Sequence, residues 1–96
     1  MSWRADSIPR RREGADGQRF GEDFVVMDPE GRTLRGLNET AARVWELSDG
    51  KRTAREIARV VADEYGVEVE RVLGDCLRFL EGLAGRGLLD AEEVLR

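Results

Sequence analysis

The chain has 96 residues, of which 41% are apolar and 38% charged, and its 16 Lys and Arg residues against 20 Asp and Glu residues give a net charge of −4. This length suits one soluble domain, and the acidic balance argues against a nucleic-acid partner because neutralisation of phosphates supplies most nonspecific affinity. With no histidine and a single cysteine, Cys76, the sequence excludes His-based catalytic triads, His-ligated metals, an intrachain disulfide and two-cysteine zinc or redox motifs.

The N-terminal residues suit neither a signal peptide nor a packed core. Residues 1–14 include the run Arg10-Arg11-Arg12 and few side chains that could pack. We expect a flexible N-terminal arm over these residues, a domain over residues 15–90 and a C-terminal tail over residues 91–96. Because no stretch is long and apolar enough for a membrane span or a signal segment, we expect a cytoplasmic protein with no membrane partner.

Short apolar stretches separated by turn residues predict a small antiparallel sheet. Phe24-Val25-Val26-Met27 runs into Asp28-Pro29-Glu30-Gly31, which is typical of a strand followed by a tight turn. Residues 33–37 then form the return strand, and residues 17–22 form a third strand. A sheet this small has exposed edges, which present unpaired backbone N–H and C=O groups.

Three helices are predicted after the sheet. Asn38 can cap the first helix, and Thr53 with Glu56 fits a capping box at the start of the second. Gly66 ends the second helix, and a third helix is expected from about Val69 to Arg86, without an Asp or Ser at its start. The sequence therefore predicts an α+β, winged-helix-like fold with a three-stranded antiparallel sheet followed by three helices.

The third helix carries an apolar arc over roughly half of its circumference, which is wider than the ~100° that one core face needs. Val72 and Phe79 lie at the edge of this arc. Either the helix is buried on two sides, or this edge lines an open groove. Gly82 lies near the same edge, where a glycine removes bulk and lets another backbone approach.

The sequence contains no recognisable catalytic, metal or cofactor site. Gly50-Lys51-Arg52-Thr53 resembles part of a phosphate-binding loop, but Trp45 stands where that loop needs its first glycine, and a predicted helix precedes it. Pairs of acidic residues are expected on the solvated surface at this charge density. Cys76 lies on the apolar arc and is interpreted as a small core residue. We therefore expect a protein that is not an enzyme.

A series of motifs runs through most of the chain. It comprises the segment from Val25 to Trp45, the link Asp49-Gly50-Lys51-Arg52-Thr53, the pair Glu56-Ile57, and the pattern Asp75…Phe79-Leu80…Leu83…Gly87-Leu88-Leu89. In order and spacing this series resembles the PqqD-like family, also known as the RiPP recognition element. The resemblance extends over about residues 17–89.

The resemblance implies a stand-alone domain that binds the leader segment of a ribosomally synthesised precursor peptide. Such a domain presents the leader to a modifying enzyme, for example a radical SAM enzyme or a lasso-peptide protease. The leader would add as a strand beside residues 33–37 and lie between them and the third helix, with Arg71 or Arg78 meeting its acidic residues. The implied contact residues are Thr33, Leu34, Arg35, Gly36, Leu37, Arg71, Val72, Asp75, Arg78, Phe79 and Gly82.

The predicted order of elements also fits a second class of protein. A hairpin with three helices is the arrangement of a winged helix-turn-helix, so an acidic winged-helix regulator or a structural dimerisation module is the alternative function. Neither the second nor the third predicted helix carries the basic stripe that is typical of a DNA reader, so no nucleic-acid partner is expected. Exposed sheet edges permit either a monomer or a strand-swapped dimer.

Overall fold

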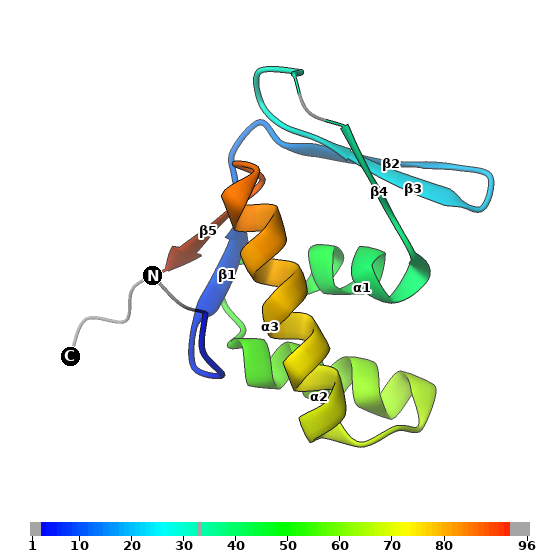
Figure 1. Ribbon diagram of the computed structural model, residues 1–96, viewed down its shortest axis with the longest axis vertical. Coiled ribbons are helices and arrows are strands. Elements are labelled where there is room, and N and C mark those ends of the chain that lie inside the picture. Colours follow the sequence, from blue (N-terminus) through cyan, green and yellow to red (C-terminus); the bar gives the residue numbers. More distant parts are fainter. Residues whose placement is uncertain (1–2, 33, 93–96) are drawn as a thin grey trace.

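The computed structural model describes residues 3–32 and 34–92, which form five strands and three helices. In chain order these elements are β1 (Ile8–Arg11), β2 (Asp16–Phe20), β3 (Asp23–Met27), β4 (Leu34–Leu37), α1 (Glu39–Leu47), α2 (Ala54–Tyr65), α3 (Val69–Gly85) and β5 (Leu89–Glu92). Figure 1 shows β2, β3 and β4 at one end of the molecule and α2 at the other. None of these helices is long and apolar enough to cross a membrane.

The predicted three-stranded antiparallel sheet is present, with the strand order β2-β3-β4. Its inner face carries Phe24, Val26 and Leu37, all buried, because side chains alternate between the two faces of a strand. The turn after β3 also forms as the sequence indicates: Gly31 adopts a φ of 71° and its N–H donates to the carbonyl of Asp28 at 3.0 Å. β4 is therefore an edge strand, with β3 as its single partner among the described residues.

The helices begin and end where the sequence signals predict. Asn38 accepts a hydrogen bond from the N–H of Ala41, and Thr53 and Glu56 form the capping box at the start of α2. Gly66 ends α2 in the left-handed conformation, with a φ of 66°. The first turn of α3 has no side-chain cap, as expected from its sequence. Local signals thus mark the start of α1 and both ends of α2.

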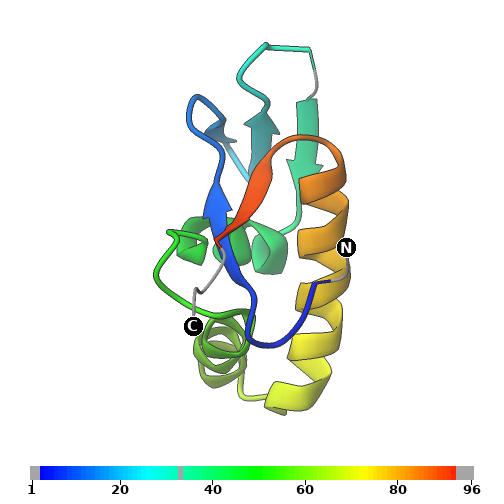
Figure 2. The same ribbon diagram turned by 90° about the vertical axis from the view of Figure 1, so that its left-hand side faces the viewer.

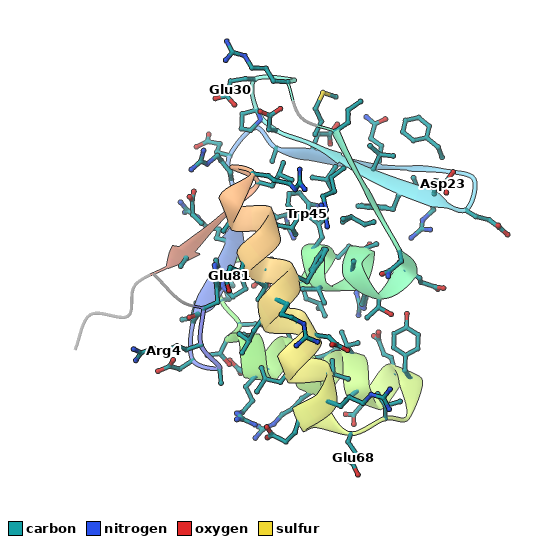
Figure 3. The ribbon with its side chains drawn as sticks, viewed as in Figure 1. Arg4, Asp23, Glu30, Trp45, Glu68 and Glu81 are labelled. Atoms are coloured by element: carbon teal, nitrogen blue, oxygen red, sulfur yellow. The ribbon has the colours of Figure 1, made fainter. Side chains whose placement is uncertain are left out.

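The sheet packs onto α1 through Trp45. Figure 3 shows Trp45 between α1 and the three-stranded sheet, and only 3% of its surface is exposed. Gly17 on β2 makes this contact possible, because a Cβ at that position would lie 2.8 Å from both the indole Nε1 of Trp45 and the ring of Phe24. The same helix is joined to α2 by Arg43, whose guanidinium donates three hydrogen bonds to the carboxylate of Glu64.

The N-terminal segment differs from the expected flexible arm. Residues 8–11 form β1, which pairs with β5 in a second, two-stranded antiparallel sheet, so residues 91–92, expected in the tail, belong to a strand. Figure 2 shows these two strands side by side. Pro9 is completely buried, and the carbonyls of Ala5 and Ser7 accept the N–H groups of Arg55 and Ala54 at the start of α2.

The N-terminal segment adopts a defined structure because it supplies hydrogen-bond acceptors to backbone N–H groups of α2 that would otherwise lack partners. The first backbone N–H groups of a helix have no acceptor within the helix, and residues 5 and 7 supply two of them. Leu88 and Leu89 are almost completely buried, and pairing with β1 fixes the strand that carries Leu89. Residues 1–2 and 93–96, which belong to the expected arm and tail, lie outside the described residues.

Candidate functional site

An open pocket of about 320 Å³ lies between α1 and the middle of α3. We refer to it as the α1–α3 pocket; its lining residues are Asn38, Thr40, Ala41, Val44, Val72, Asp75, Cys76 and Phe79. Val44, Val72 and Phe79 make its floor apolar. Phe79 is only half-buried, so part of its ring faces this space. Of the two interpretations of the wide apolar arc, the open groove is therefore present at this edge of α3.

The free edge of β4 leads directly into the pocket. β4 ends at Leu37, and the next residue, Asn38, is both the N-cap of α1 and a lining residue. In Figure 1, β4 descends to the start of α1. An extended chain that pairs with the edge of β4 would therefore have the α1–α3 pocket at one end of its path.

The predicted residues of the return strand divide between two faces. Leu34 and Gly36 are exposed on the outer face of the sheet, whereas Arg35 and Leu37 belong to the inner face, where Leu37 joins the core. Thr33, the first residue of the predicted set, lies outside the described residues. Only the inner-face positions of β4 thus point toward the side of the sheet that the helices occupy.

The predicted residues of α3 also separate into two groups. Val72, Asp75 and Phe79 line the α1–α3 pocket. Arg71, Arg78 and Gly82 are exposed on the same helix but are not among its lining residues. A Cβ added at Gly82 would meet no atom within 4 Å, so no side chain of the described residues occupies the space above it.

Arg78, one of the two cations expected to meet an acidic leader residue, already has a partner. Its guanidinium forms an ion pair with Asp75, one helical turn earlier, and both side chains are largely exposed to solvent. The pair combines opposite charges at the rim of the pocket, so the net charge that α3 presents there is small. An exposed pair of this kind contributes about 0–1 kcal/mol.

Sequence reasoning missed the wall of the pocket that α1 supplies. Thr40, Ala41 and Val44 line the pocket from the first helix, for which the sequence predicts only a cap, and Cys76, interpreted as a core residue, lines it from α3. Helical spacing shows which residues share a face, but it does not show which neighbouring helix that face meets. The packing of α1 against α3 therefore had to come from the tertiary structure.

Burial determines the chemistry of Cys76. The thiol is 2% exposed, and burial raises its pKa to about 12, so it stays protonated at neutral pH. In the native protein at about pH 8 we expect no reaction with a colorimetric disulfide reagent over the time in which a free cysteine reacts completely. The same reagent should titrate one thiol in denaturant. Rapid modification of the folded protein would show that Cys76 is accessible through the pocket.

Comparison with known protein families shows which family this chain belongs to. The family model described as coenzyme PQQ synthesis protein D (PqqD) matches residues 23–89. The chain belongs to the PqqD family. That match includes all three helices and the strands β3 and β4, and therefore the whole α1–α3 pocket. A search of curated proteins found no match.

Three solved structures share the fold of this PqqD family protein. The PqqD truncation of Methylobacterium extorquens PqqCD, described as a functional and stand-alone RiPP recognition element, is 25% identical over 93% of this chain and 95% of its own, with a TM-score of 0.81. TbiB1 in complex with the TbiA(beta) leader peptide is 24% identical over 88% of this chain and 99% of its own, with a TM-score of 0.75. Lasso peptide synthetase B1 complexed with the leader peptide is 20% identical over 86% of this chain and 98% of its own, with a TM-score of 0.74.

Across residues 3–32 and 34–92, no group of three or more His, Cys, Asp or Glu side chains is placed to hold a metal ion. What the site offers instead is a line of backbone groups along β4 and an apolar pocket at its end. This combination suits the binding of an extended peptide.

Proposed function

We propose that this PqqD family protein binds the leader segment of a ribosomally synthesised precursor peptide and presents it to a modifying enzyme, without catalysing a reaction itself. The observation that carries the proposal is the unpaired edge of β4, which leads into the α1–α3 pocket. The similar structures of TbiB1 and lasso peptide synthetase B1, each in complex with a leader peptide, support it.

In this proposal the leader binds by strand addition. Its backbone forms hydrogen bonds with the edge of β4, and alternate side chains point toward the helices. Burial of one apolar leader side chain against Val72 and Phe79 contributes about 1.5–3 kcal/mol. A charged contact at the exposed rim contributes about 0–1 kcal/mol. Apolar anchoring therefore dominates affinity, while rim charges act mainly on the association rate.

The described side chains fit a binding role better than a catalytic one. The chain has no histidine, and the protonated thiol of Cys76 is a poor nucleophile. The chemistry is then supplied by a partner, such as a radical SAM enzyme or a lasso-peptide protease. Holding the leader beside that enzyme raises the effective concentration of the precursor at the active site.

Titration with a labelled leader peptide tests the proposal. The probe is the fluorescein-labelled leader of a precursor encoded beside the gene of this protein, and fluorescence anisotropy is the measurement. We expect binding at least about 10-fold tighter than that of a scrambled leader, equivalent to about 1.4 kcal/mol. N-methylation of single leader residues should weaken binding with a period of two residues, because alternate N–H groups face β4. Equal binding of the scrambled leader would contradict the proposal.

Two helical glycines allow a further prediction about the same site. Gly82 lies beside the expected path of the leader, whereas Gly74 lies earlier on α3; neither has an atom within 4 Å of an added Cβ. Gly→Ala at either position should stabilise the free protein by about 0.5–1 kcal/mol, because alanine favours the helix. Only a bulkier change at Gly82, such as Gly82→Leu, should weaken leader binding, while Gly74→Leu should not. Thermal unfolding and anisotropy measure the two effects, and equal binding by both Leu variants would place the leader elsewhere.

A further inference from the structure

Arg35 has an unpaired polar atom within the protein. Its Nε is shielded from solvent and has no hydrogen-bond partner among the described residues. An unsatisfied buried donor is unfavourable, and more so when the group is charged. Such a donor therefore indicates either local strain or a partner that is absent from the free protein.

The position of Arg35 shows which partner could reach it. Arg35 pairs with Val26 of β3, so it shares the inner face of the sheet with Leu37, two residues further along β4. The α1–α3 pocket begins at Asn38, immediately after Leu37. Because β4 is an edge strand, the side of Arg35 away from β3 is the side on which a guest strand would lie.

Other cations near the groove are less suited to a specific contact. Arg78 is already paired with Asp75, and Arg71 is exposed to solvent. An exposed cation is well hydrated and gains little from an added carboxylate. Arg35 is only partly accessible, so its guanidinium is less hydrated than an exposed one. A carboxylate on a guest strand would satisfy the unpaired Nε with a charge-assisted hydrogen bond once the Arg35 side chain turns toward it.

We propose that Arg35 selects peptides that carry an Asp or Glu two residues from the apolar side chain in the α1–α3 pocket; this inference rests on the proposed function. Guest side chains alternate between faces, so the residue opposite Leu37 and the one opposite Arg35 both point inward and are two apart. Antiparallel addition, which continues the pattern of the sheet, gives the order apolar–x–acidic from N to C terminus. Parallel addition gives the reverse order.

Selection from a peptide library tests this inference without knowledge of the natural leader. The probe is a display library of randomised peptides of about twelve residues, selected on the full chain. We expect enrichment of Asp or Glu at a spacing of two from an apolar residue. For a selected peptide, replacement of its acidic residue by the matching amide should weaken binding roughly 10- to 100-fold, as for the loss of a hydrogen bond to a charged group.

Variants of the protein provide the matched comparison. Arg35→Gln should lose the same 10- to 100-fold in affinity and should no longer distinguish acid from amide. Arg35→Glu should regain affinity for a peptide with Lys at the acidic position. Arg59→Gln removes an equal charge from the exposed face of α2 and should bind as the wild type does. Because the Nε of Arg35 has no hydrogen-bond partner among the described residues, the melting temperature of Arg35→Gln should equal or exceed that of the wild type.

The outcomes separate this inference from the proposed function. If no selected peptide loses affinity on Phe79→Ala, the groove is not the binding site and the proposed function is wrong. If selected peptides depend on Phe79 but carry no acidic preference, or bind Arg35→Gln as tightly as the wild type, the function stands and the role of Arg35 is refuted. A markedly lower melting temperature for Arg35→Gln would likewise refute it, because Arg35 would then have a structural partner.

Discussion

Phe79→Ala is expected to weaken binding of the leader peptide by roughly 10- to 100-fold. The Phe79 ring lines the α1–α3 pocket and is half-buried, so it presents apolar surface that a guest side chain can cover. Burying one apolar side chain contributes about 1.5–3 kcal/mol, and loss of that contribution corresponds to this range of affinity. Fluorescence anisotropy with the labelled leader measures the change directly.

The matched control for this variant is Leu77→Ala. Leu77 is a half-buried residue of the same helix that packs against the core but does not line the pocket. Both truncations remove apolar contacts, at a cost below the ~3–5 kcal/mol of a fully buried large side chain, so both proteins should stay folded. Only Phe79→Ala should lose binding. Equal losses in the two variants would mean that the effect comes from general destabilisation rather than from the pocket.

Deletion of residues 1–11 is expected to lower the melting temperature by more than about 10 °C or to prevent folding. The deletion removes β1 and the fully buried Pro9, leaving β5 without its partner strand. It also removes the acceptors of two N–H groups at the start of α2. Partial exposure of Leu88 and Leu89, at about 1.5–3 kcal/mol for each fully buried side chain, adds to this loss. A loss of several kcal/mol is a large part of the ~5–15 kcal/mol available to such a domain.

Arg12→Gln is the control that shows whether the loss of melting temperature in the deletion variant comes from the lost strand pairing or from the lost charge of the basic run. Arg12 forms an exposed ion pair with Asp90 at 3.0 Å, so its loss should cost no more than about 1 kcal/mol. Circular dichroism during thermal unfolding compares the two variants. If the deletion left the melting temperature unchanged, residues 1–11 would be the flexible arm that the sequence indicates.

Most of the fold could be predicted because its signals are local. The cap at Asn38, the capping box at Thr53 and the glycine at Gly66 each depend on residues within one turn, and all three function as predicted. The turn from Asp28 to Gly31 likewise forms through contacts between near neighbours. Such interactions are independent of the rest of the chain, so spacing alone reveals them.

The second sheet could not be predicted because its signals are not local. β1 and β5 pair across almost the entire chain. β1 lacks the alternating pattern of a half-buried strand, and the alternation in β5, Leu-Asp-Ala-Glu, extends over only four residues. Pro9 is typical of a break in a strand, and the run Arg10-Arg11-Arg12 is typical of a solvated segment. This N-terminal segment is held in place by contacts with β5 and with the start of α2, and no periodicity in the sequence indicates those contacts.

The sequence alone determined the three-stranded sheet, the helix bounds, the apolar edge at Val72 and Phe79, and the family to which the chain belongs. Only the tertiary structure decided that α1 forms the opposite wall of a pocket, that Arg78 is paired with Asp75, and that the Nε of Arg35 lacks a hydrogen-bond partner among the described residues. The physical reason is the range of the interactions. Caps, turns and periodicity act within a few residues, whereas a pocket and an unsatisfied charge exist only where distant segments pack together.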